Sequence, residues 1–124
     1  MENLQIHKAN VQELYDLSML EEMDDNEYLL DMISTLLHEV PKDFKEMKMA
    51  LQTGEIDIVC KQAHKIKNSA NVIQADKLIA ILGDIETLGK NGAMAEELKH
   101  FVENALHQFN DIEKALKEYT NELK

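Results

Sequence analysis

His64 is the residue of this chain whose type and surroundings are best suited to chemistry. It lies in the stretch 63–70, where Lys61, Lys65 and Lys67 bring positive charge close to it in an otherwise acidic protein. A neutral imidazole is a good nucleophile, and neighbouring cations favour the approach of a dianionic phosphoryl group. These residues suggest a histidine that carries phosphate, although a lone histidine on a helix is more often an ordinary surface residue.

The helical pattern places His64 beside the buried face of its helix. At 100° per residue, with Ala63 at zero, His64 lies at about 100°. The apolar side chains cluster between about −60° and +20° by the same arithmetic, and they are Ile56, Val59, Ile66 and Ala70. We therefore expect the imidazole to be at least partly exposed.

Lysines and amides surround His64 on this outer side. Lys61 precedes it by one helical turn, Lys67 and Asn68 follow it by one turn, and Asn71 falls on the same side two turns on. Lys67 can offset the negative charge of a phosphorylated ring, with Lys61 assisting from the other side.

Composition favours an all-α protein of one domain. The chain has 124 residues, of which 44% are hydrophobic and 5% aromatic, with four glycines and one proline. Helix formers dominate, and the chain has too few glycines and prolines for the many turns of a many-stranded sheet. The length suits a single domain, 1–124.

Apolar spacings of three and four residues predict one short and four long helices. After an N-terminal arm at about 1–13, the short helix covers about 16–23, and the long helices cover about 26–51, 56–72, 76–88 and 94–123. Pro41 lies inside the first long helix, and the unbroken apolar pattern across it predicts a bend and not a break. Long amphipathic helices joined by short loops predict an up-down-up-down four-helix bundle with a short extra N-terminal helix.

Charge and cysteine content narrow the classes of function. The formal net charge of −11 makes nucleic-acid binding unfavourable. No apolar run is long enough to cross a bilayer, and the first residues lack the basic and apolar regions of a signal peptide. The single Cys60 suits a reducing interior. We expect a cytoplasmic, monomeric and free-standing protein that does not bind membranes.

The chain resembles the histidine-containing phosphotransfer (HPt) domains of bacterial two-component phosphorelays. Their motif is close to His-x-(Leu/Ile)-Lys-Gly-Ser-(Ser/Ala)-x-x-(hydrophobic)-Gly-Ala, and residues 64–75 here read His-Lys-Ile-Lys-Asn-Ser-Ala-Asn-Val-Ile-Gln-Ala. The segments 16–20 and 44–57 also match, so that the likeness covers about residues 14–122.

The resemblance implies a phosphocarrier that lacks an ATP-binding kinase domain. His64 would accept a phosphoryl group from a receiver-domain aspartate or pass one on, and Lys67 corresponds to the family's phosphate-stabilising lysine. The implied partners are response-regulator receiver domains, with a hybrid sensor kinase as a second candidate. The receiver would supply the magnesium ion, and this chain would bind no cofactor and no metal of its own.

Two positions depart from the family's motif. Asn68 replaces the first glycine, where it could crowd an approaching receiver or hydrogen-bond the imidazole or phosphoryl oxygens. Gln74 replaces the second glycine, at the end of the helix. Both changes leave the nucleophile and Lys67 in place. We expect Lys61, Lys65, Asn68 and Asn71 to form the partner-binding surface.

A metal site and a kinase module are the first two alternatives. His100 and His107 share a helix face and His38 could approach them, but no i,i+4 histidine pair occurs. A sensor-kinase phosphoacceptor module typically has an acidic residue after its histidine, where this chain has Lys65. No glycine-rich nucleotide loop is present either, so autophosphorylation from ATP is not expected.

A passive helical-bundle interaction module, in which His64 is incidental, is the third alternative. Cys60 lies one turn before His64, and a Cys-His nucleophile would lack an oxyanion hole. Lys61, Lys65, Lys67 and Lys77 are predicted to form a positive patch that orients docking to an acidic receiver site; the equally weighted alternative is that these lysines only solvate the helix.

Overall fold

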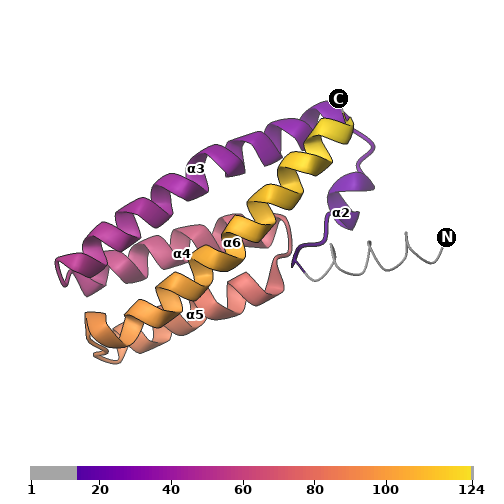
Figure 1. Ribbon diagram of the computed structural model, residues 1–124. Coiled ribbons are helices and arrows are strands. Elements are labelled where there is room, and N and C mark those ends of the chain that lie inside the picture. The colour runs from indigo at the N-terminus through magenta and orange to yellow at the C-terminus, as the bar shows by residue number, and fades with distance from the viewer. Residues whose placement is uncertain (1–13, 124) are drawn as a thin grey trace.

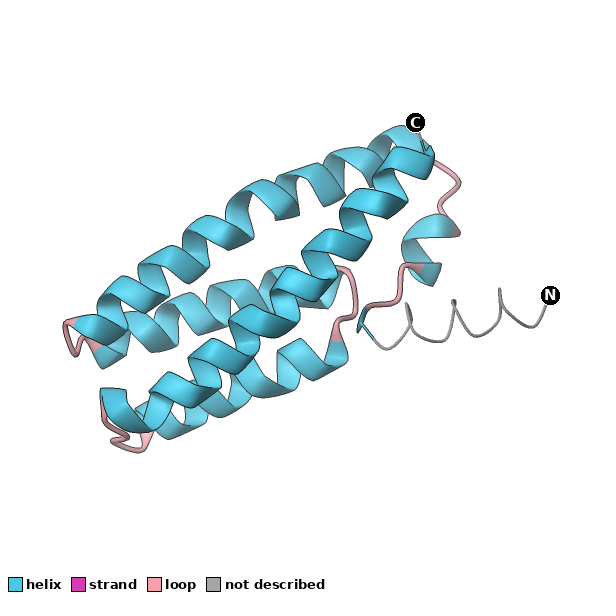
Figure 2. Cartoon of the chain, in the orientation of Figure 1, coloured by secondary structure: helices cyan, strands magenta, loops and turns pink. Residues whose placement is uncertain are grey.

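The computed structural model describes residues 14–123, and the described chain folds into one short and four long helices (Figures 1 and 2). The predicted N-terminal arm at about 1–13 lies outside the described residues. Figure 2 shows no strand within the described part. The helices are α2 Ser18–Glu21, α3 Asn26–Gln52, α4 Ile56–Val72, α5 Asp76–Lys90 and α6 Ala95–Leu123.

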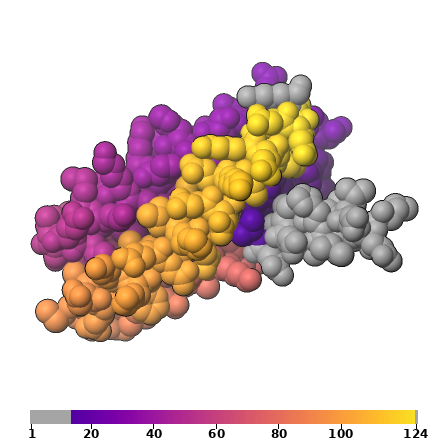
Figure 3. Space-filling view, in the orientation of Figure 1, coloured from indigo at the N-terminus to yellow at the C-terminus, as the bar shows by residue number. Residues whose placement is uncertain are grey.

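The four long helices form an up-down-up-down bundle, as predicted. Each packs against its neighbours in the chain, and α6 closes the ring by packing against α3. In Figure 1 the turns α3–α4 and α5–α6 lie at one end of the bundle and the turn α4–α5 at the other. Figure 3 shows α6 running diagonally across the visible face, with α3 along one side of it. No helix in the described chain is long and apolar enough to cross a membrane.

The core consists of the apolar stripes that the spacing predicts. Phe44 of α3 and Phe109 of α6 meet in its centre with ring centroids 5.6 Å apart. Helix α3 is continuous across Pro41, because buried neighbours on both sides keep the chain helical although proline cannot donate to the carbonyl four residues earlier. The largest fully buried side chains are Phe44, Ile33, Met47, Ile66, Ile73, Leu78, Leu82, Ile85, Leu98, Ile112, Leu116 and Val40.

Three of the long helices end in the same backbone motif. Gly54 after α3 and Gly92 after α5 have φ values of +74° and +90°, and Gln74 takes the same place after α4 with φ +49°. There the N–H of Ala75 donates to the Ala70 carbonyl at 3.0 Å and the N–H of Gln74 to the Asn71 carbonyl at 3.2 Å. These two bonds define a Schellman motif, so the geometry usually given to glycine is kept with glutamine.

Helix α2 is fastened across one end of the bundle (Figure 1). The N–H of Asp16 donates to the Ile73 carbonyl at 2.8 Å, and the hydroxyl of Tyr119 near the end of α6 donates to Glu21 Oε2 at 2.6 Å. Asp25 caps the next helix by accepting from the N–H of Tyr28 at 3.0 Å. The turns at this end therefore position the start of α3 and the end of α4.

Candidate functional site

His64 lies on the outer side of α4 and is held by a carboxylate from α5. Its Nδ1 lies 3.1 Å from Glu86 Oε2, and its side chain is 59% exposed while that of Glu86 is 9% exposed. An ionised carboxylate only accepts hydrogen bonds, so the proton of the neutral imidazole is assigned to Nδ1. The other ring nitrogen, Nε2, then carries the free lone pair.

Two lysines join His64 around the same carboxylate. Lys67 Nζ is 2.6 Å from Glu86 Oε1, and Lys90 Nζ is 3.9 Å from Glu86 Oε2. Burial alone would raise the pKa of Glu86, but hydrogen bonds and charge from Lys67 and His64 outweigh it and hold this pKa below its ordinary value of 4.5. Glu86 is therefore an anion at neutral pH.

A close approach of α4 and α5 beside the site allows this contact. The Sγ of Cys60 occupies the space into which a side chain at Gly89 would project, and the Cys60 thiol faces the Glu86 carbonyl at 3.8 Å. Only glycine leaves room there, so the two helices meet closely three residues after Glu86 on one helix and four before His64 on the other. This approach keeps the carboxylate within reach of the ring.

The side of α4 that faces α3 carries a second ion pair. Lys65 Nζ lies 3.0 Å from Oδ1 of the buried Asp43, and this hydrogen bond and charge raise the pKa of Lys65. One turn away, the amide of Gln62 donates to Glu46 Oε2 at 2.8 Å. The charge of Lys65 is therefore largely balanced, which reduces its value as an independent docking cation.

The four residues expected to bind a partner, Lys61, Lys65, Asn68 and Asn71, are all exposed. Lys67 is 27% exposed, close to the ring but engaged with Glu86. Lys77 is nine residues before Glu86 on α5, or about 13 Å along the helix, so it does not belong to the cluster around His64. The lysine of α5 that lies near His64 is instead Lys90, which contacts Glu86.

Cys60 and the other histidines offer no competing centre. Burial raises the pKa of the Cys60 thiol, against the lowering effect of Lys90, so the thiol stays protonated and is a poor nucleophile. His38, His100 and His107 are exposed. Among residues 14–123, no three His, Cys, Asp or Glu side chains come together in a way that could hold a metal ion.

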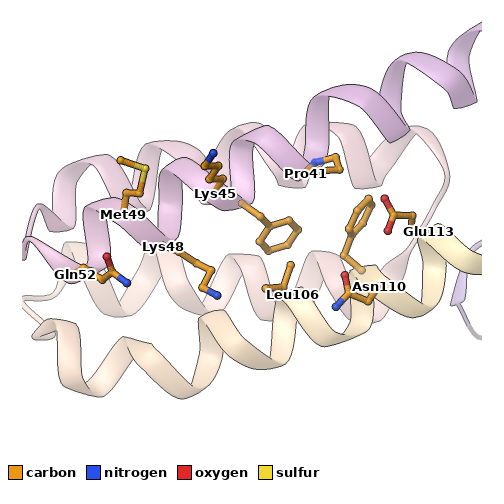
Figure 4. Close-up of a pocket in the computed structure, with 10 residues that line it drawn as sticks. Pro41, Lys45, Lys48, Met49, Gln52, Leu106, Asn110 and Glu113 are labelled. Carbon is orange, nitrogen blue, oxygen red and sulfur yellow. The ribbon is translucent and has the colours of Figure 1, made fainter.

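A hollow of about 330 Å³ lies on a different side of the bundle. It opens between α3 and α6, and Figure 4 shows Pro41, Lys45 and Lys48 of α3 and Leu106 and Asn110 of α6 around it. None of the residues singled out for chemistry lines it. His64 instead presents its free nitrogen on an open helical surface, which requires a second molecule to complete a reaction site.

Glu86 is the functional residue that sequence reasoning missed. Leu78, Leu82 and Ile85 mark the inward side of α5, and Glu86 follows Leu82 by four residues and is 7% exposed. A carboxylate on the buried stripe was the available signal, because such a group is rarely buried without a partner. The partner itself depends on how α4 and α5 are rotated against each other.

Comparison with known proteins identifies the family. The Hpt domain family model matches residues 31–118, a span that contains both His64 and Glu86. The chain belongs to the Hpt domain family. Hpt domains are the histidine phosphotransfer domains of phosphorelays, so the predicted resemblance is confirmed. No curated protein matches the chain significantly.

Solved structures share the fold of this Hpt domain. Histidine-containing phosphotransfer protein B (HptB) from Pseudomonas aeruginosa PAO1 superposes with a TM-score of 0.78 at 20% identity, covering 88% of this chain and 96% of that one. The HPT domain of the Hpt sensor hybrid histidine kinase from Shewanella gives a TM-score of 0.76 at 16% identity, covering 89% and 96%. At these identities the likeness establishes the fold.

Proposed function

We propose that this Hpt domain is a phosphocarrier in which His64 Nε2 accepts a phosphoryl group from a receiver-domain aspartate and passes it to another. The observation that carries the proposal is the hydrogen bond between His64 Nδ1 and Glu86. It leaves Nε2 as the free nucleophile on an exposed surface, next to Lys67.

The geometry supports a simple transfer with balanced charges. The P–O bond of the receiver's aspartyl phosphate breaks, the Nε2–P bond forms, and the receiver's carboxylate leaves. The imidazole keeps its Nδ1 proton and becomes positively charged, and Glu86 offsets that charge across the 3.1 Å contact. Lys67 is one helical turn away and can offset the dianionic phosphoryl group.

The receiver would supply what this surface lacks. Both oxygens of Glu86 already have partners, His64 and Lys67, which makes it a poor ligand for a divalent ion. We therefore assign the magnesium ion and most of the transition-state stabilisation to the partner. The chain acts as a carrier and not as an ATP-dependent kinase, and we propose that it works as a cytoplasmic monomer. A hybrid sensor kinase remains a candidate donor through its receiver domain.

Lys61, Lys65, Asn68 and Asn71 are the proposed docking residues around the ring. All four are exposed; Lys61, Asn68 and Asn71 lie near His64 on the helix surface, and Lys65 lies on the side that faces α3. A receiver that covers this surface of α4 would contact them. A passive interaction module is the less favoured function, since it gives no role to a buried carboxylate that orients an exposed imidazole.

The test is phosphoryl transfer from a panel of labelled, phosphorylated receiver domains. We expect acid-labile label on the wild-type protein and none on His64→Gln, whose exposed side chain is replaceable without loss of fold. His100→Gln, which alters another exposed histidine, is the matched control and should be labelled like the wild type. Label that persists in His64→Gln, or no label from any cognate receiver, would refute the proposal.

A further inference from the structure

Three side chains with nitrogen donors gather around the carboxylate of Glu86. His64 and Lys67 already contact its two oxygens at 3.1 and 2.6 Å. Lys90 approaches the oxygen that His64 uses, yet stops at 3.9 Å. Its side chain is 71% exposed, and its contact with Glu86 is the one ion pair it makes within residues 14–123.

Lys67 has two demands on its single ammonium group. In this structure it is bound to Glu86, but the phosphate-stabilising role requires it to face a group on Nε2. When Lys67 turns to the phosphoryl oxygens, the buried carboxylate of Glu86 loses one hydrogen-bond donor. Loss of a hydrogen bond to a buried charged group is costly in free energy. Phosphorylation of His64 therefore creates a vacancy at Glu86 Oε1.

We propose that Lys90 is a positioning residue that replaces Lys67 on Glu86 when His64 is phosphorylated. This inference rests on the proposed function. Lys90 follows Glu86 by four residues, the order in which a Glu–Lys pair on a helix is most favourable. Its Nζ already lies 3.9 Å from Oε2 of the same carboxylate, and its side chain is exposed, so it is placed to compensate the charge of Glu86 when Lys67 leaves. Lys67 is thereby released to the phosphoryl group, and Glu86 keeps a lysine partner beside the phosphorylated ring.

The exchange predicts that Lys90 contributes more to the stability of the phosphorylated protein than to that of the unphosphorylated protein. His64 can be phosphorylated without a receiver by phosphoramidate. The N–P bond of phosphoramidate breaks as the Nε2–P bond forms, and ammonia leaves. Urea unfolding at alkaline pH, where phosphohistidine is long-lived, then gives the folding equilibrium constant of each form. We expect Lys90→Ala to lower the folding equilibrium constant about fivefold more in the phosphorylated than in the unphosphorylated protein, or about 1 kcal/mol.

Three further variants isolate the cause. Lys90→Arg keeps a cation and should restore the wild-type values. In a Glu86→Gln background Lys90→Ala should have the same effect on both forms, because no carboxylate is left to receive it. Lys117→Ala is the matched control, since Lys117 pairs with Glu113 at the same spacing and at 3.9 Å on α6, and it should not respond to phosphorylation.

Two results would overturn the proposal that Lys90 replaces Lys67. One is an equal effect of Lys90→Ala on both forms, and the other is a phosphorylation-dependent effect that persists in the Glu86→Gln background. Neither result touches the proposed function, because the donor here is a small molecule. Conversely, failure of every receiver to label His64 would refute the carrier function while the phosphoramidate measurement still reports on Lys90.

Discussion

At the scale of single residues, the orientation of His64 depends on a charge balance at Glu86. Burial opposes the ionised carboxylate, and Lys67 and His64 reverse that effect, so that the pKa of Glu86 in the folded protein lies below its ordinary value. A carboxylate with a lowered pKa stabilises the folded state above its ordinary pKa. That contribution is lost as the pH falls through the lowered value.

Glu86→Gln should therefore destabilise the protein at pH 7 by about 1–2 kcal/mol, the loss of charge-assisted hydrogen bonds. The difference from the wild type should shrink as the pH falls from 4.5, the ordinary value, through the lowered pKa of Glu86. Below that lowered pKa the folded protein holds a protonated Glu86, which resembles glutamine. Urea unfolding between pH 7 and pH 3 measures both quantities. Glu113→Gln, which breaks a more exposed pair on α6, should cost less than about 0.5 kcal/mol. A pH-independent difference for Glu86→Gln would contradict this account.

Asn68 stands one turn from His64 on the exposed side of α4, at the family's glycine position. Its side chain makes no hydrogen bond to the ring within the described structure, so crowding of the receiver is its expected effect. Asn68→Gly should speed transfer from a receiver by at least about threefold, since small displacements of reacting groups are costly. It should cost about 0.5 kcal/mol of stability. Stopped-flow transfer measures the first effect, with Asn104→Gly on α6 as the control for added helix flexibility. A slower Asn68→Gly would show that the amide assists transfer.

The helical pattern predicted the exposure of His64 and the nearness of Lys67, because both follow from positions on one helix. It could not predict Glu86 or Asp43 as partners. Each lies on the buried stripe of another helix, and its contact with α4 depends on the rotation and register of two packed helices. Those quantities depend on side-chain volumes such as the missing side chain at Gly89, which the apolar period does not contain.

At the scale of elements, the end of α4 has a left-handed backbone conformation at a residue that is not glycine. The helix boundaries were predictable because apolar spacing and the turn residues at Gly54 and Gly92 agree with each other. The turn after α4 has no glycine, yet the same Schellman hydrogen bonds form with Gln74 at φ +49°. A side chain in this left-handed region costs roughly 1–2 kcal/mol, and the packing of Ile73 and Ala75 in the core maintains it.

Gln74→Gly should raise the free energy of unfolding by about 0.5–1 kcal/mol. Relief of the left-handed conformation outweighs the greater freedom of glycine in the unfolded chain and the loss of the contact of Gln74 with Met19 Sδ at 3.0 Å. The reverse change, Gly92→Gln, should destabilise by about 1 kcal/mol. Gly92 has open space around it, so only its backbone conformation is tested. Chemical denaturation measures both, and a Gln74→Gly variant less stable than the wild type would show that the side-chain contact dominates.

At the scale of the whole molecule, a few lysines stand out against a net charge of −11. The structure makes the positive patch smaller than the sequence suggested, because Asp43 balances Lys65 and Glu86 balances Lys67. Lys61 is exposed beside His64 and forms no ion pair within residues 14–123. It is therefore the cation best placed to attract the acidic active site of a receiver from a distance.

Lys61→Glu should slow association with a receiver about three- to tenfold at low ionic strength, because it reverses an unpaired positive charge beside His64. The difference should narrow as salt rises and the Debye length falls to about 8 Å at physiological ionic strength. Lys114→Glu on α6 changes the net charge equally, but it lies on an exposed part of another helix, so a much smaller effect is expected. Stopped-flow association rates at two salt concentrations distinguish a local effect of Lys61 from an effect of the total net charge. Equal slowing by both variants would mean that total charge governs the encounter, and a Lys61→Glu rate that ignores salt would mean that Lys61 only solvates its helix.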